Sequence, residues 1–269
     1  MWSCQPDLEY SIHGYTEKII VEGSIANGEF PRVYLSLNVP LWLEVDSATI
    51  LDKVIRTAKV TVSDGEHTEI LTSRWDREHF PPYVYRGTEL KGETGKTYSL
   101  TVEHSGYTIR AQTTIPAAPV VRGFNILTVE NSDSLRILST IVDIDSASGN
   151  GYRFYSKKQQ DGFFVETPIV YNDQLSLYGE QEFMISPKPK AQFPSFDEGS
   201  YFMTGDSVFV KVCTIDSTTT NFFNSFSIDN FPGKDFFLGE HETLNSNITL
   251  PGFGIWYGYG VKNYLVVIE

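Results

Sequence analysis

Short segments in which hydrophobic and polar residues alternate, separated by turn-forming residues, constrain the fold of this chain more than any other feature. Residues 58–63 alternate strictly and end at Asp64-Gly65, and residues 97–103 repeat the alternation. Successive side chains of a β-strand point to opposite faces, so a period of two indicates a strand with one buried face. Asp-Gly after such a run is typical of a two-residue hairpin turn, which predicts that residues 67–71 return beside the first strand.

The order of these segments predicts a mostly β protein with two domains. About seven such strands within residues 17–116 match the size and strand number of an immunoglobulin-like β-sandwich without the antibody-type disulfide. Pro116 and Pro119 follow, and because proline has no backbone N–H to give to a central strand, residues 115–119 are interpreted as a stiff connector. Residues 117–269 then return to strand patterns and are predicted to form a second antiparallel β domain.

Two further elements are expected within the second domain. Asp216 is a suitable N-cap, and the phenylalanines that follow it have helical spacing, which predicts one short helix near residues 217–228. Near the C-terminus, residues 252–260 mix glycine with aromatic side chains, and residues 261–268 are strongly hydrophobic. This end of the chain is predicted to be a closing hairpin or a bent pair of strands.

Composition and charge exclude several classes of protein. Hydrophobic residues make up 41% of the 269 positions, which is enough to build a core. The net charge of −13 opposes binding to nucleic acid, because such binding needs a basic surface that displaces counterions. No apolar run approaches the roughly 20 residues that a membrane-spanning helix needs.

The first residues predict a lipid anchor. Cys4 follows the small residue Ser3 and precedes a polar stretch. In bacterial lipoproteins a cysteine in this setting carries the lipid, so Cys4 is the candidate lipidation site and residues 1–16 are the expected tether. The alternative is an ordinary cysteine without a role. The second cysteine, Cys213, lies in a strand-like segment and is expected to be buried.

The sequence contains no motif that predicts catalysis or a metal site. Residues 92–97 lack the first glycine of a phosphate-binding loop and run into a predicted strand instead of a helix. Residues 143–150 lack the third ligand and the turn glycine of a calcium loop. The histidines are scattered, with no pair at the spacing of a helical metal site. We therefore expect no enzyme activity, no cofactor and no metal.

Three aromatic residues near the C-terminus are candidate ligand contacts: Trp256, Tyr257 and Tyr259. Exposed aromatic rings beside glycines could stack on sugar rings. The alternative is that the rings fill the core while the glycines let the strand bend.

A set of segments in a fixed order carries a family resemblance: Ile20–Ile25, Pro31–Ser36, Ala58–Gly65, Gly95–Val102, Ala111–Pro116, Ser246–Ile248 and Gly252–Trp256. Together they resemble a Bacteroidetes lipoprotein family known as domain of unknown function 4249. The resemblance implies an envelope lipoprotein, often encoded near outer-membrane transporters of the TonB-dependent kind. It supplies no catalytic residues.

The same resemblance suggests sites of modification. Exported proteins of that lineage can carry O-linked glycans where Asp-Ser precedes a small or aliphatic residue. The candidate sites are Ser47, Ser134, Ser146, Ser207 and Ser217. Asp-Ser is also common in turns, and that alternative stays open.

These observations predict a non-catalytic outer-membrane lipoprotein, on the periplasmic or the surface side, that acts as a binding module. The expected partner is a TonB-dependent transporter, the cargo of that transporter or a ligand at the cell surface. The alternatives are a glycan- or peptide-binding accessory protein and a structural or adhesion module.

Overall fold

The structure is a computed structural model, and it describes residues 17–39, 46–77, 79, 82–144, 149–167, 179–187, 201–225 and 245–269. Its strands are β1 (Ile19–Ala26), β2 (Arg32–Leu37), β3 (Lys59–Ser63), β4 (Thr68–Trp75), β5 (Tyr83–Arg86), β6 (Thr97–His104), β7 (Tyr107–Thr114), β8 (Val120–Thr128), β9 (Leu135–Ile144), β10 (Gly151–Lys158), β11 (Val165–Glu166), β12 (Gly179–Ile185), β13 (Phe202–Met203), β14 (Ser207–Ile215) and β15 (Gly252–Val267). The helices in these ranges are α1 (Ser47–Asp52) and α2 (Ser217–Ser225). The prediction of a mostly β protein is confirmed.

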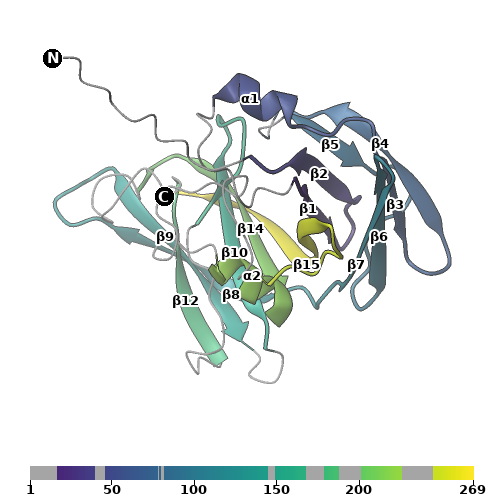
Figure 1. Cartoon of the computed structure of the whole chain (residues 1–269). Helices are drawn as coiled ribbons and strands as arrows, with labels where there is room; N and C mark the ends of the chain where they lie inside the picture. The colour runs from purple at the N-terminus through teal and green to yellow at the C-terminus, as the bar shows by residue number, and fades with distance from the viewer. Residues whose placement is uncertain are drawn as a thin grey trace, which may run out of the picture.

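The first unit is a sandwich with β1, β2 and β5 on one side and β3, β4, β6 and β7 on the other (Figure 1). Strand β4 changes partner halfway, because Thr68–Leu71 pairs with β3 and Thr72–Trp75 pairs with β5. Alternation buries one face of each layer, and in β6 the buried residues are Tyr98, Leu100 and Val102. All pairs within β1–β7 are antiparallel, so this unit is the predicted immunoglobulin-like sandwich.

The second unit also has two layers. Strands β8, β12 and β13 pair with β9, and this sheet faces β10, β14 and the end of β15 across a second core. Phe154, Phe183 and Phe202 are almost completely buried in that core, and the rings of Phe154 and Phe183 are 5.0 Å apart. Large aromatic side chains therefore hold the layers of the second unit together.

Strand β15 belongs to both units (Figure 1). Its first half, Gly252–Tyr259, pairs in parallel with β1, and its second half, Tyr259–Val267, pairs antiparallel with β14. In the described residues these pairings create one 11-stranded sheet in the order β11-β10-β14-β15-β1-β2-β5-β4-β3-β6-β7. The prediction of a hairpin or a bent strand pair at this end of the chain is therefore wrong, because the segment is one strand of 16 residues.

The C-terminal segment also completes the first core. Ile248 and Trp256 are buried among residues of the first unit. The indole Nε1 of Trp256 donates a hydrogen bond to the carbonyl oxygen of Tyr98 at 3.0 Å, and the side chain of Asn247 donates one to the carbonyl oxygen of Trp256 at 2.7 Å. The domain division between residues 116 and 117 stays a prediction, but the first core contains side chains from both sides of it.

The loop after β3 differs from the predicted turn. Ser63 pairs with Thr68, so the loop contains the four residues between them instead of two. The carboxylate of Asp64 accepts hydrogen bonds from the backbone N–H groups of Glu66 at 3.0 Å and His67 at 2.7 Å. An aspartate that bonds to the backbone just after it stabilises a longer turn, and the Asp-Gly pair alone does not reveal this.

Helix α2 begins as the sequence predicts. Asp216 caps it, because its Oδ1 accepts a hydrogen bond from the backbone N–H of Thr219 at 2.7 Å. Phe222 packs against Phe253 and Ile255 on β15. The predicted residues 226–228 lie outside the described residues, and helix α1 was not predicted. None of the helices in the described ranges is long and apolar enough to cross a membrane.

Candidate functional site

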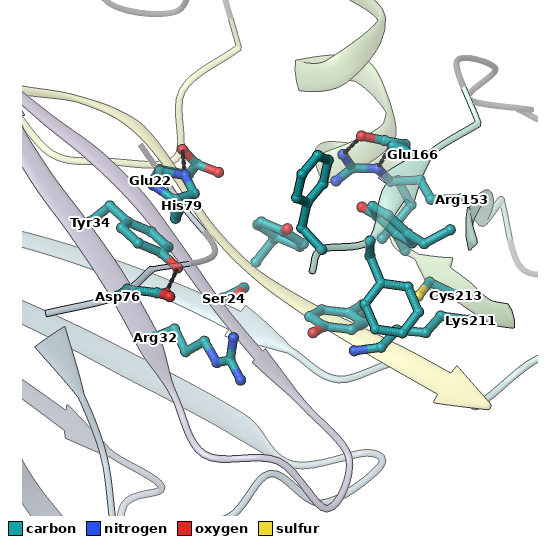
Figure 2. Close-up of a pocket in the computed structure, with 16 residues that line it drawn as sticks. Glu22, Ser24, Arg32, Tyr34, Asp76, His79, Arg153, Glu166, Lys211 and Cys213 are labelled. Carbon is teal, nitrogen blue, oxygen red and sulfur yellow. Dashed lines mark hydrogen bonds and ion pairs between the residues drawn. The ribbon is translucent and has the colours of Figure 1, made fainter. Parts of the chain in front are cut away.

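We call the 11-stranded sheet that runs through both units the shared sheet. Its face turned away from the two cores carries a pocket of about 340 Å³ (Figure 2). Residues of β1, β2, β10, β14 and β15 line it, so both units contribute to it. The charged side chains of its lining are Glu22, Arg32, Asp76, Arg153, Glu166 and Lys211. The aromatic ones, besides His79, are Tyr34, Tyr155, Phe163, Phe164, Tyr257 and Tyr259. We call this hollow the shared-sheet pocket.

Alternation along the strands places the lining residues. In β1, Val21 points into the first core, whereas Glu22 and Ser24 line the pocket. In β15, Trp256 points into the same core, and Tyr257 lines the pocket. Because β15 lies between β1 and β14, the side chains of both units meet on one surface.

Glycines on the opposite side of β15 make this arrangement sterically feasible. A Cβ atom on Gly258 would lie 2.8 Å from the carbonyl oxygen of Thr114, and one on Gly260 would lie 2.6 Å from that of Ala117. The connector between the two units therefore lies directly against β15, and only glycine leaves room for it. The glycines face the connector, and the tyrosines between them face the pocket.

Arg153 is the most deeply buried charged residue of the pocket, with 7% of its surface exposed. Its Nε and Nη2 donate hydrogen bonds to the two carboxylate oxygens of Glu166 at 2.5 and 2.6 Å. The guanidinium carbon lies 3.7 Å from the centre of the Phe223 ring. Burial lowers the pKa of Arg153 and the charge of Glu166 raises it, with a net rise above the ordinary value. Its Nη1 is buried and has no hydrogen-bond partner.

The opposite wall contains a second polar group (Figure 2). The hydroxyl of Tyr34 donates a hydrogen bond to Oδ2 of Asp76 at 2.9 Å. The ring of His79 stacks on that of Tyr34, with centroids 3.8 Å apart, and its Nε2 lies 3.8 Å from Oε2 of Glu22. Burial, helped by the hydrogen bond to Asp76, raises the pKa of Tyr34 far above its ordinary value. Tyr34 therefore stays protonated and acts as a hydrogen-bond donor.

The centre of the floor carries Lys211, Cys213 and Tyr257. The Nζ of Lys211 lies 3.8 Å from Oε1 of Glu29 and 4.5 Å from the centre of the Phe164 ring. Burial raises the pKa of the Cys213 thiol to about 12, so it remains a thiol at neutral pH. Burial likewise raises the pKa of Tyr257 to about 12.

The structure separates the three aromatic residues that the sequence singled out. Trp256 is completely buried, so its interpretation as a ligand contact is wrong; its ring fills the first core and contacts Gly23. Tyr257 and Tyr259 are half-buried and line the shared-sheet pocket. Sequence reasoning missed Arg153, although the alternation of its strand placed it opposite the buried Phe154 and marked its face as the outer one.

The candidate modification sites lie apart from the pocket lining. Ser134 is exposed before β9, Ser207 is half-buried at the start of β14, and Ser217 is exposed at the start of α2. Ser47 begins α1, and its side chain lies outside the described residues, as do Ser146 and Cys4. Cys213 is buried, as predicted. Glycosylation and lipidation stay predictions.

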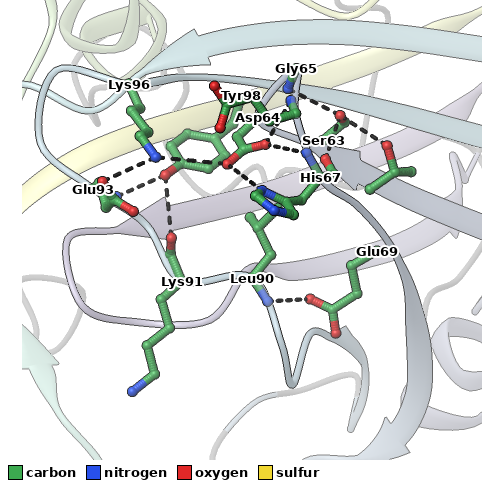
Figure 3. A network of polar contacts seen from close by, with 12 residues as sticks. Ser63, Asp64, Gly65, His67, Glu69, Leu90, Lys91, Glu93, Lys96 and Tyr98 are labelled. Atoms are coloured by element: carbon green, nitrogen blue, oxygen red, sulfur yellow. Dashed lines mark hydrogen bonds and ion pairs between the residues drawn. The ribbon is translucent and has the colours of Figure 1, made fainter.

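A second hollow of about 280 Å³ lies beside Asp64, Glu69 and Glu93. Figure 3 shows the polar contacts of these residues. The carboxylate of Glu69 accepts hydrogen bonds from the backbone N–H groups of Thr88 at 2.5 Å and Leu90 at 2.9 Å. Its oxygens therefore hold the segment before β6 in place. No group of His, Cys, Asp and Glu within the described ranges has the arrangement of a metal site.

Comparison with known proteins identifies the family. The family model described as domain of unknown function (DUF4249) matches residues 3–264. The chain belongs to this family. No curated protein matches the sequence.

Solved structures similar to this DUF4249 protein include a cytokine receptor complex and the FN1–FN3 domains of chicken CNTN1. The former is 8% identical, with 74% of this chain and 85% of that chain covered and a TM-score of 0.24. The latter is 11% identical, with 76% of this chain and 64% of that chain covered and a TM-score of 0.25.

Proposed function

We propose that this chain is a non-catalytic binding protein of the cell envelope that holds a ligand in the shared-sheet pocket. The observation that supports the proposal is the pocket itself, with about 340 Å³ of space between aromatic rings and a small number of charged groups. Small-molecule sites typically have this size and this combination of rings and placed polar groups. Tyr257 and Tyr259 face the pocket, which favours a glycan or a peptide side chain as the bound group.

The ionisation of the pocket residues supports binding over nucleophilic catalysis. A cysteine attacks as a thiolate, and the raised pKa of Cys213 keeps it protonated. The raised pKa of Tyr34 has the same effect on the phenol. His79, which could serve as a base, stacks on Tyr34 and lies near Glu22.

The cellular setting is part of the same proposal. Residues 1–16 support a tether to the outer membrane through lipid on Cys4, on its periplasmic or its surface side. There the protein would deliver its ligand to a TonB-dependent transporter or bind that transporter directly. In this setting the pocket would hold the cargo, and the rest of the surface would contact the transporter.

Ligand binding is tested with a variant in which a large side chain fills the pocket. Ser24 is half-buried on its floor, so Ser24→Trp should occupy the space that a ligand needs. Protein purified from its native host should release a bound small molecule on denaturation, identified by mass spectrometry, and Ser24→Trp should release none. Ser73→Trp, at an exposed position of β4, is the matched control and should retain it. Equal release from both variants would contradict the pocket as the binding site.

Two measurements test the setting. Labelling with a palmitate analogue should succeed in the wild-type protein and fail in Cys4→Ser. Equal labelling of the two would contradict the predicted lipid anchor. Crosslinking in native membranes should recover an outer-membrane β-barrel transporter with the wild-type protein. Failure to recover one would contradict the transporter as a partner, but it would not affect the proposal that the pocket binds a ligand.

A further inference from the structure

Resting on the proposed binding function, we propose that the shared-sheet pocket selects ligands in which a carboxylate lies next to an apolar ring or side chain. The basis is an imbalance between donors and acceptors. The carboxylates of the pocket lining have partners on its own walls, whereas cationic donors remain without one. An incoming acceptor with a negative charge would correct that imbalance.

The acidic side chains of the lining are engaged. Both oxygens of Glu166 accept hydrogen bonds from Arg153. Asp76 accepts the hydroxyl proton of Tyr34, and Glu22 lies 3.8 Å from His79. A cationic ligand would therefore compete with existing contacts for each of these groups.

The cationic side chains retain donors. Nη1 of Arg153 is buried without an acceptor, and a buried unpaired donor costs free energy that a ligand oxygen would recover once the groups covering this atom move aside. The side chain of Arg32, which also lines the pocket, makes no ion pair or hydrogen bond with any residue in the described ranges. Lys211 has three donors and approaches Glu29 only at 3.8 Å.

The shape of the donors favours a planar anion. A guanidinium presents parallel N–H groups that match the two oxygens of a carboxylate, and such paired bonds are stronger than those to neutral acceptors. Phe164 lies beside Lys211, and Tyr257 and Tyr259 lie on the same floor, so an apolar group of the ligand would meet aromatic rings. The lining has as many basic as acidic side chains, in contrast with the net charge of −13 of the whole chain. An anion that is repelled elsewhere on the protein is therefore accepted here.

Isothermal titration calorimetry on the full chain tests the inference with two matched pairs of probes. One pair is methyl glucuronide and methyl glucoside, and the other is acetyl-Phe-Ala as the free acid and as the amide. At least one acid should bind about tenfold more tightly than its neutral partner, the difference expected from one charge-assisted hydrogen bond. Preference for the glucuronide would indicate an acidic sugar as the source of the carboxylate, and preference for the peptide acid would indicate a peptide C-terminus.

Variants assign the preference to the pocket. Arg32→Gln should weaken binding of the acid more than binding of its neutral partner, and so remove most of the acid preference. Arg110→Gln removes the same charge from an exposed position on β7 and should change neither affinity. Circular dichroism checks that both variants fold.

The failure of this inference differs from the failure of the proposed function. If neutral probes bind as tightly as the acids and Ser24→Trp abolishes that binding, the pocket binds ligands but the carboxylate preference is wrong. The carboxylate preference is also wrong if neither acid binds, or if Arg32→Gln retains the full preference.

Discussion

Glu69 shows how one carboxylate can hold a segment in place (Figure 3). Only 7% of its surface is exposed, and backbone N–H groups of Thr88, Glu89 and Leu90 donate to it. Burial raises its pKa, but these hydrogen bonds outweigh burial and bring the pKa below the ordinary value of 4.5. Such a carboxylate stabilises the fold when it is ionised, because its donors have no other partner of equal strength.

The pH dependence of unfolding should reveal this contribution. Since the folded pKa of Glu69 is depressed, its stabilisation is present above the unfolded pKa and is lost as the pH falls through the folded value. Glu69→Gln should lower the free energy of unfolding by about 3 kcal/mol at neutral pH, because charged hydrogen bonds are lost. The difference from wild type should shrink in acid, as followed by urea denaturation. A difference that is the same at every pH would contradict the assignment.

Trp256 and Tyr257 are neighbours with opposite roles. Trp256 is fully buried, and its indole donates to the carbonyl oxygen of Tyr98. Trp256→Ala should lower the free energy of unfolding by about 3–5 kcal/mol, because it leaves a large cavity and an unpaired carbonyl. Tyr257→Ala, at a half-buried position that lines the pocket, should cost less and mainly reduce ligand binding. Chemical denaturation of the two variants compares them directly, and equal losses would contradict this division.

At the scale of the element, the pairing of β1 with β15 depends on Gly254. Its φ is +128°, and a Cβ atom there would lie 1.9 Å from the carbonyl oxygen of Val21. Gly254→Ala must therefore separate the two strands, and we expect a loss of more than about 3 kcal/mol. Gly95→Ala is the control, because φ is also positive but nothing lies within 4 Å; it should cost about 1 kcal/mol. Thermal denaturation compares the stability of the two variants. Similar losses would mean that the close approach of Gly254 to Val21 is not needed for the pairing of β1 with β15.

The sequence predicted elements whose signals are local. Strand β6 was predicted over residues 97–103 and spans Thr97–His104, and α2 begins at its predicted cap. Strand β13 spans only Phe202–Met203, which is too short to show a period. The parallel pairing of β15 joins segments more than 200 residues apart, and strand patterning alone does not specify a partner at that distance.

The pocket was less predictable than the strands for the same reason. Tyr257 and Tyr259 were recognised because glycine and aromatic residues alternate within one segment. For Arg153 the alternation of its strand indicates only the face on which it lies, because its role depends on Glu166 and on Phe223 of α2. Trp256 was misassigned because the same pattern of an aromatic residue beside glycine occurs both in protein cores and on protein surfaces.

For the whole molecule, the shared strand predicts that the first unit is not independent. A fragment of residues 17–116 lacks Ile248 and Trp256 from its core and loses the pairing of β1 with β15. We expect this fragment to show no cooperative urea transition, whereas the full chain unfolds cooperatively. Circular dichroism and intrinsic fluorescence follow both. A fragment as stable as the full chain would contradict the expectation and support two separable domains.

The position of β15 in the chain has a consequence for biosynthesis. It follows every other described strand, so it is the last of them to leave the ribosome. Until residues 252–267 emerge, the newborn polypeptide exposes the edges of β1 and β14 together with unfilled apolar surface. Exposed edges of that kind favour wrong association, so holdase chaperones should remain bound until this final strand has paired with β1 and β14.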